Sequence, residues 1–194
     1  SMNAVRTLSR WAYCATAQGV SMPLVATCGR VNGEDTSVVV RFDLPSEMGL
    51  GLQNVALDLV VAPTGAAKMS VPAGVNVDVW ALGVETVGVN DDCLLNVNPF
   101  LAGTADTRKL LNGEAPVRLG TLVTGGGVLV PGSTLIGSDE LRANLVDYLA
   151  PRLGTGLWTG TGVRQLVLRL NATVPSAANA PDWGFGVGSV VTPD

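Results

Sequence analysis

Tryptophan and polar residues on one face of an alternating segment are the part of this sequence whose chemistry favours ligand binding. In "GVNVDVWALG", Asn76, Asp78 and Trp80 alternate with valines, so in a strand their side chains share one face. Arg169 has the same position in a second alternating segment, "RQLVLRLNATV". Sugar C–H groups pack on an indole ring, and carboxylate, amide and guanidinium groups bind sugar hydroxyls. We therefore predict Asn76, Asp78, Trp80 and Arg169 as glycan-binding residues.

The same residues also fit a structural role. If the alternating segments lie in one sheet, the face that carries Trp80 also carries the side chains of Arg41, Asp43, Asp58 and Asn171. Charged side chains on neighbouring strands of a solvated sheet pair with one another, and each pair contributes roughly 0.2–1 kcal/mol to stability. Both interpretations stay open from the residue types.

A further tryptophan, Trp158, lies in the segment "LGTGLWTGTGV", residues 153–163. A phosphate-binding loop has a lysine followed by serine or threonine after its glycines, and it opens a helix. This segment has no lysine and precedes a strand pattern, so phosphate binding is not predicted. Trp158 is a candidate sugar platform, with Thr159 and Thr161 as hydroxyl partners. The alternative is that its ring packs on the core, as tryptophan commonly does.

Two acidic stretches are weak candidates for a structural Ca²⁺ site. "VNGEDTS" offers Asn32, Glu34 and Asp35, and "VNDDC" offers Asp91 and Asp92. Hard cations bind several carboxylate and carbonyl oxygens, but neither stretch has the spacing of an EF-hand loop. Turns favour the same residue types, so a turn without metal is the alternative.

Histidine is absent from the sequence, which excludes several catalytic sites. A Ser-His-Asp or Cys-His site cannot form without it. Glycoside hydrolysis needs two opposed carboxylates, and no such pair is evident. A polysaccharide lyase would need Tyr13, Tyr148, Lys68 or Lys109 as its base. The sequence therefore favours a non-catalytic protein, with a polysaccharide-acting enzyme as an alternative.

Length and charge limit the partners. A chain of 194 residues is long enough for one domain with a sizeable core. Its 12 Lys and Arg against 16 Asp and Glu give a net charge of −4, which argues against nucleic-acid binding because phosphates require clustered cations. No apolar run is long enough to predict insertion into a membrane.

The three cysteines, Cys14, Cys28 and Cys93, form no CxxC pair, so a zinc site is not predicted. In an exported protein Cys14 and Cys28 could form a disulfide. Free buried thiols are the alternative.

Four segments alternate between apolar and polar residues and are predicted to be strands, each with one packed and one polar or wet face. They are Thr36–Ser46, Asn54–Pro63, Gly74–Gly83 and Arg164–Val174. Weaker strands are expected near Val20–Thr27, Val117–Thr124, Gly127–Val130 and Phe185–Val191, and a weak helix around Ala105–Leu111.

One clear helix is predicted near Ser138–Ala150, with Ser138 as N-cap and Pro151 after its last turn. Leu141, Leu145 and Leu149 form a single apolar stripe. We expect this stripe to cover one end of a two-sheet sandwich.

In order along residues 36–173, the segments "VVVRFDLPS", "VALDLVV", "VNVDVWAL", "LRANLVDYLAPRL" and "LVLRLNATV" resemble the bacterial jelly-roll domains of the DNRLRE kind. The resemblance implies a jelly-roll sandwich related to carbohydrate-binding modules. It also implies a non-catalytic part of an exported or cell-surface protein.

The sequence thus predicts a single all-β domain over residues 1–194, a two-sheet jelly-roll sandwich with one short helix, in which the first 35 residues are assigned to no element of the jelly roll. The expected function is non-catalytic carbohydrate binding or adhesion, with a polysaccharide or glycan as partner, outside the cell or at its surface. The alternative from a different class is a structural module, such as a surface stalk or virion component, that binds no small ligand.

Overall fold

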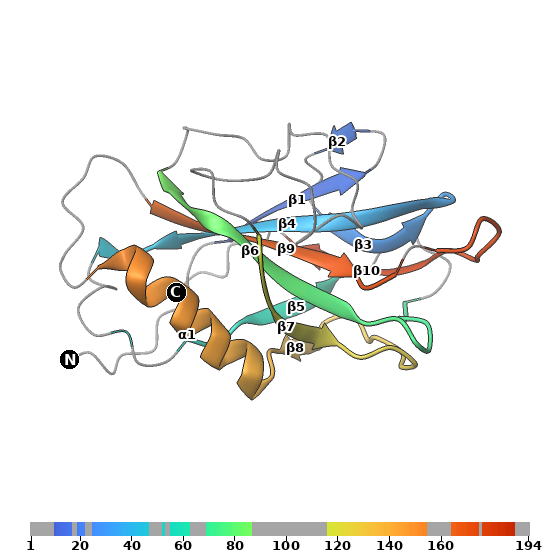
Figure 1. Cartoon of the computed structure of the whole chain (residues 1–194). Helices are drawn as coiled ribbons and strands as arrows, with labels where there is room; N and C mark the ends of the chain where they lie inside the picture. Colours follow the sequence, from blue (N-terminus) through green and yellow to red (C-terminus); the bar gives the residue numbers. More distant parts are fainter. Residues whose placement is uncertain are drawn as a thin grey trace.

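The computed structural model describes residues 10–16, 19–21, 25–46, 52, 55–62, 69–86, 116–154, 164–174 and 176–188. Along these residues the chain forms strands and one helix (Figure 1). The strands are β1 (Arg10–Thr16), β2 (Gly19–Ser21), β3 (Val25–Val31), β4 (Glu34–Leu44), β5 (Asp58–Ala62), β6 (Val77–Thr86), β7 (Val117–Val123), β8 (Thr134–Ile136), β9 (Arg164–Ala172) and β10 (Trp183–Gly188). The helix, α1, spans Asp139–Leu153.

The strands form two packed antiparallel sheets. One sheet has the order β7-β6-β9-β4 and the other β3-β10-β5-β8, and the β3–β4 hairpin joins them. β1 pairs with β4, and β2 with β1. Along the chain, β3, β5, β8 and β10 lie in one sheet while β4, β6, β7 and β9 lie in the other. This interleaved order is that of a jelly roll, so the predicted all-β two-sheet sandwich is confirmed.

The core lies between the two sheets, where the apolar faces of the alternating segments meet. Each of the four strongest strand predictions is confirmed in its buried face. From one sheet come Val38, Val40, Val77, Val79, Leu168 and Leu170, and from the other come Leu59, Val61, Phe185 and Val187, all at most 1% exposed.

The opposite face of β9 differs from the prediction. Val167, Arg169 and Asn171 were expected to face solvent, but every residue of β9 is buried. β9 is a central strand, paired with β6 on one side and β4 on the other, so its polar side chains lie among those of its neighbours. At β9 this face is therefore polar, as one of the two predicted alternatives has it, but it is not wet.

The helix begins where predicted and ends later. Ser138 is the N-cap, and its side chain accepts a hydrogen bond from the Leu141 amide at 3.2 Å. Pro151 does not end the helix, which continues to Leu153, because proline removes only one main-chain hydrogen bond of the last turn. Gly154, with φ of 72°, follows as C-cap.

α1 lies along one side of the sandwich, next to β7 (Figure 1). Leu141, Leu145 and Leu149 are all buried, as the sequence predicts. Gly120 of β7 allows this approach, because a Cβ there would lie 3.3 Å from Cβ of Leu141.

Several weaker predictions need correction or lie outside the described residues. Val20–Thr27 is divided between β2 and β3. Gly127–Val130 forms a single bridge, between Ser70 and Val128, and the strand lies further on at β8 because the Pro131–Gly132 turn comes between. Cys28 is a buried thiol rather than half of a disulfide, and the side chain of Cys14 lies outside the description. The weak helix around residues 105–111 lies outside the described residues.

Candidate functional site

The pairing of β6 with β9 places the predicted glycan-binding residues beside one another. Asp78 lies opposite Asn171, and Trp80 lies opposite Arg169. On its other side β6 pairs with β7, where Asp78 lies opposite Thr121 and Trp80 opposite Arg118. We call Asp78, Trp80, Arg118, Arg169 and Asn171 the polar cluster.

Asp78 is bound by its neighbours on β7. Nε of Arg118 donates to Oδ2 of Asp78 at 2.8 Å, and a second Arg118 nitrogen lies 3.4 Å from Oδ1. The Thr121 hydroxyl donates to Oδ1 at 2.9 Å. The side chain of Asp78 is 9% exposed, whereas that of Arg118 is 42% exposed. The hydrogen bond to Asp78 raises the pKa of Arg118.

Arg169 is the largest fully buried side chain in the described part of the chain, at 1% exposed. Its Nε donates to the Ser37 hydroxyl at 3.2 Å, across the pairing of β9 with β4. Asn171 is also buried, so its "NAT" sequon is shielded in the folded chain. The guanidinium of Arg169 is therefore buried and links β9 to β4.

Asn76 acts on a loop. Its side-chain oxygen accepts a hydrogen bond from the main-chain amide of Gly125 at 3.1 Å. The main-chain amide of Asn76 donates to the Thr173 hydroxyl at 3.1 Å. These bonds tie the loop after β7 to the ends of β6 and β9. The side-chain amide of Asn76, which was predicted to bind a sugar, thus bonds the main chain of Gly125.

The tryptophans differ in their surroundings. Trp80 is half-buried, and Trp183, the first residue of β10, is buried in the core. Trp158 and its neighbouring threonines lie outside the described residues, and so does the side chain of Trp11. Of these two described tryptophan side chains, Trp80 is the one that is partly exposed and could contact a partner.

The residues proposed for Ca²⁺ lie at the β3–β4 hairpin. Asn32, at φ 52°, and Gly33, at φ 76°, form its turn. The Asp35 carboxylate accepts from the Ser176 amide at 3.2 Å and the Ser176 hydroxyl at 2.6 Å, with Arg30 3.8 Å away. The side chain of Glu34 lies outside the description, as do Asp91 and Asp92. Within the described ranges, no three acidic, cysteine or histidine side chains gather as metal ligands would.

Sequence reasoning missed three residues that organise these sites. Asp182 accepts from the amides of Asn32 and Gly33 at 2.8 and 3.1 Å, and Arg30 donates to the carbonyls of Ala178 and Ala180, each at 3.1 Å. Arg118, the partner of Asp78, is the third. An Asn-Gly pair is a strong signal for a tight hairpin, so Asn32 and Gly33 could have identified this turn from the sequence. Local sequence held no comparable signal for Arg118.

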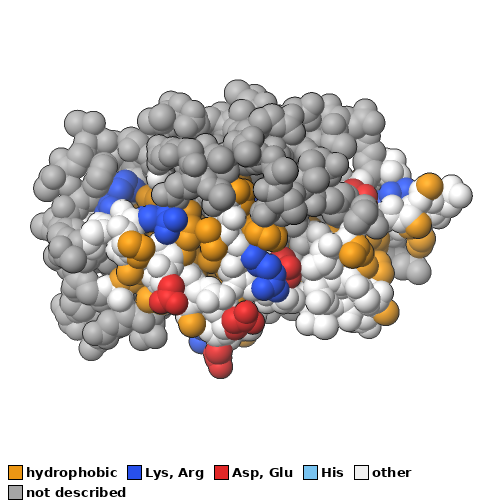
Figure 2. All heavy atoms as spheres, viewed as in Figure 1, with side chains coloured by type: hydrophobic (Ala, Val, Ile, Leu, Met, Phe, Trp, Pro, Cys, Tyr) orange, Lys and Arg blue, Asp and Glu red, His pale blue; other side chains and the backbone are white. Residues whose placement is uncertain are grey.

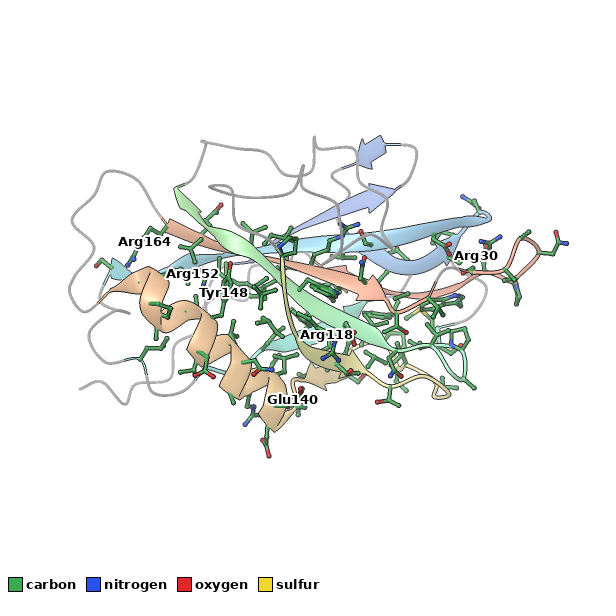
Figure 3. All side chains as sticks on the ribbon, in the orientation of Figure 1. Arg30, Arg118, Glu140, Tyr148, Arg152 and Arg164 are labelled. Atoms are coloured by element: carbon green, nitrogen blue, oxygen red, sulfur yellow. The ribbon has the colours of Figure 1, made fainter. Side chains whose placement is uncertain are left out.

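A second cluster of arginines lies at the C-terminal end of α1 (Figure 3). Arg152 lies 3.6 Å above the ring of Tyr148 and donates to the Tyr148 carbonyl at 2.7 Å. Arg164 lies 3.4 Å from the Leu153 carbonyl, and burial lowers its pKa. Tyr148, a candidate lyase base, is thus buried beneath a cation. Tyr13, Lys68 and Lys109 have no described side chains.

No protein-family model matches this chain. No curated protein matches it either. Among the described residues, α1 is too short and too polar to cross a membrane. On the face shown in Figure 2, charged side chains of both signs are scattered among the described residues and form no basic patch. The proposed function therefore rests on the geometry of the polar cluster.

We expect the Arg118–Asp78 contact to stabilise the fold measurably. Arg118→Ala should lower the free energy of unfolding by about 1–2 kcal/mol, because it removes both hydrogen bonds that Arg118 donates to a largely buried carboxylate. Asp78→Ala should cost a similar amount, and the double variant less than the sum, with a coupling of about 1 kcal/mol. Urea unfolding measures all three, and Asp147→Ala on the exposed face of α1 is the control. Strict additivity would contradict the contact.

Proposed function

We propose that this chain is a structural module that acts through protein–protein contacts and binds no small ligand at its polar cluster. The observation that carries the proposal is how the predicted sugar-binding groups are used. The Asp78 carboxylate accepts hydrogen bonds from Arg118 and Thr121, and Arg169 is fully buried beside Ser37. A sugar hydroxyl would have to displace these bonds, which cost free energy to break.

The fold is compatible with this proposal but does not decide it. Jelly-roll sandwiches occur in capsid proteins as well as in lectins. Exposed apolar side chains favour the structural alternative. They include Val128 at 81% exposed and Val130 and Ile136 at 61% each. Exposed apolar side chains of this size support contacts with other protein surfaces when they adjoin one another.

The second candidate is glycan binding through Trp80, and one observation favours it. Trp80 is half-buried, and Arg118 beside it is the most exposed side chain of the polar cluster. An indole edge next to an exposed guanidinium would contact a sugar at the margin of the cluster. The DNRLRE resemblance, with export or surface location as its implication, supports this candidate, and a structural Ca²⁺ would belong to it.

Two measurements on the same preparation separate the candidates. Sedimentation velocity over a range of concentrations should show the average mass rising, and a glycan array with and without Ca²⁺ should show no binding. Trp80→Ala should leave both results unchanged, and Trp80→Phe is its control for packing. A chain that stays monomeric and binds a glycan, with the signal lost in Trp80→Ala, would overturn the structural proposal. Release of sugar from an arrayed polysaccharide would favour an enzyme.

A further inference from the structure

The two sheets end on the same side of the sandwich in strands β7 and β8, and the molecule treats these edges differently. α1 packs along β7, and Nδ2 of Asn144 donates to the Leu119 carbonyl of β7 at 2.7 Å. A covering helix is a common way to protect an edge strand from pairing with another chain. The β7 edge is therefore closed within the molecule.

The β8 edge is open within the part of the chain that the structure describes. The Val61 amide donates to the Ser133 carbonyl, and the Gly137 amide to the Leu57 carbonyl, each at 2.9 Å. Main-chain groups alternate in direction along an antiparallel strand, so those of Ser133, Leu135 and Gly137 face β5. The N–H and C=O groups of Thr134 and Ile136 consequently point away from it.

The side chains around this edge are exposed and mostly apolar, and the charged Asp58 of β5 lies opposite Ile136. Ile136 is 61% exposed, and Val60, opposite Thr134 on β5, is 44% exposed. Val130 lies in the turn that enters β8, where its carbonyl accepts from the Ser133 amide. Residues 119–138 contain no charged side chain.

We propose that β8 pairs antiparallel with β8 of a second copy of this chain, about a two-fold axis at Leu135. Thr134 then lies opposite Ile136 of the second copy, and Ile136 opposite its Thr134. Both pairs are of the hydrogen-bonded kind, in which the opposed residues exchange two bonds. On the outer face, Ile136 of one copy packs against Thr134 of the other, and Val60 lies on the far side of that Thr134.

The spacing of the free groups is what selects a second copy as the occupant. Two outward residues separated by one inward residue are their own complement under a two-fold rotation, so an isologous contact satisfies all of them. Pro131 before the strand and Asp139 after it keep the pairing short. The contact is thus small and closed. This contact would be one interface of the proposed assembly, so the inference rests on the proposed function.

Cysteine cross-linking tests the register. In a background with Cys14→Ser and Cys93→Ser, chains carrying Thr134→Cys are mixed with chains carrying Ile136→Cys under mild oxidation. Opposed residues of such a pair have Cα atoms about 5.5 Å apart, within disulfide range. Cross-linked dimer should form in the mixture and be several-fold less abundant with either chain alone. Equal yields in all three samples would overturn the register.

Sedimentation velocity tests the surface itself. Thr134→Pro removes an outward N–H, and Ile136→Lys places a charge on the edge, so each should weaken self-association at least roughly tenfold. Val174→Lys, at an exposed valine on another part of the surface, is the matched control and should have no effect. If the unmodified chain associates and both edge variants associate equally well, this inference falls and the proposed function stands. If the unmodified chain is monomeric throughout, both fall.

Discussion

Gly29→Ala is expected to destabilise the sandwich severely. Gly29 of β3 lies opposite Gly184 of β10, and the two main chains approach closely there. A Cβ on Gly29 would overlap the Trp183 carbonyl oxygen and lie 2.6 Å from Cα of Gly184. Both obstacles are backbone, so relief requires β3 and β10 to move apart. Gly29 also has φ of 142°, which side chains rarely adopt.

The expected loss is roughly 4 kcal/mol or more, which is a large part of the stability of an ordinary domain. Urea unfolding followed by tryptophan fluorescence measures it, since Trp183 lies at the site. Gly127→Ala is the matched control, because nothing lies within 4 Å of a Cβ there and its φ is ordinary. We expect the control to change stability by less than about 0.5 kcal/mol. Equal stability of the two variants would contradict the close β3–β10 approach.

Arg169→Ala is expected to cost roughly 3 kcal/mol. It removes the largest buried side chain described, with its packed aliphatic stem and its hydrogen bond to Ser37. Arg169→Met keeps most of the volume and removes the charge. Replacing a buried charge with an apolar side chain of similar size is often neutral or stabilising, so this variant should lie within about 1 kcal/mol of the parent.

The comparison of these two variants bears on function as well as stability. A ligand-binding arginine would lose binding in both variants, whereas a packing arginine would be replaced by methionine without loss of self-association. Urea unfolding, sedimentation velocity and the glycan array on both variants give the readouts. A stable Arg169→Met chain that binds glycan less tightly than the parent would return Arg169 to the candidate site and contradict its purely structural role.

If the protein has a structural role, its polar contacts should hold the strands in fixed positions. The polar cluster and the β3–β4 hairpin are held by side chains from segments far apart in the chain. Arg118 of β7 binds Asp78 of β6, and Asp182, just before β10, binds the main-chain amide of Asn32 in the hairpin turn. These bonds hold the strands in register at two places on the sandwich. An assembly subunit needs such a fixed shape, because its edge must meet another copy in one orientation.

Alternation of residue type is a local property, and it determined much of the fold. The periods in Thr36–Ser46, Gly74–Gly83 and Arg164–Val174 identified the strands and their core faces, because successive side chains of a strand point to opposite sides. The cap at Ser138 and the leucine stripe identified α1 for the same reason, since both lie within a few turns of chain. The place of Pro151 was predicted wrongly because one missing hydrogen bond near a helix end is tolerated.

The tertiary structure alone decided which strands are neighbours and what their second faces meet. Arg118 binds Asp78 from 40 residues away, and Ser37 binds Arg169 across 132. No local pattern carries such pairings, because register is set by the packing of the whole sheet. Burial of the second face of β9 and the open edge of β8 follow from the strand order. The sequence by itself therefore determined the main strands, the helix and the core faces, and the strand order decided which polar side chains lie beside one another.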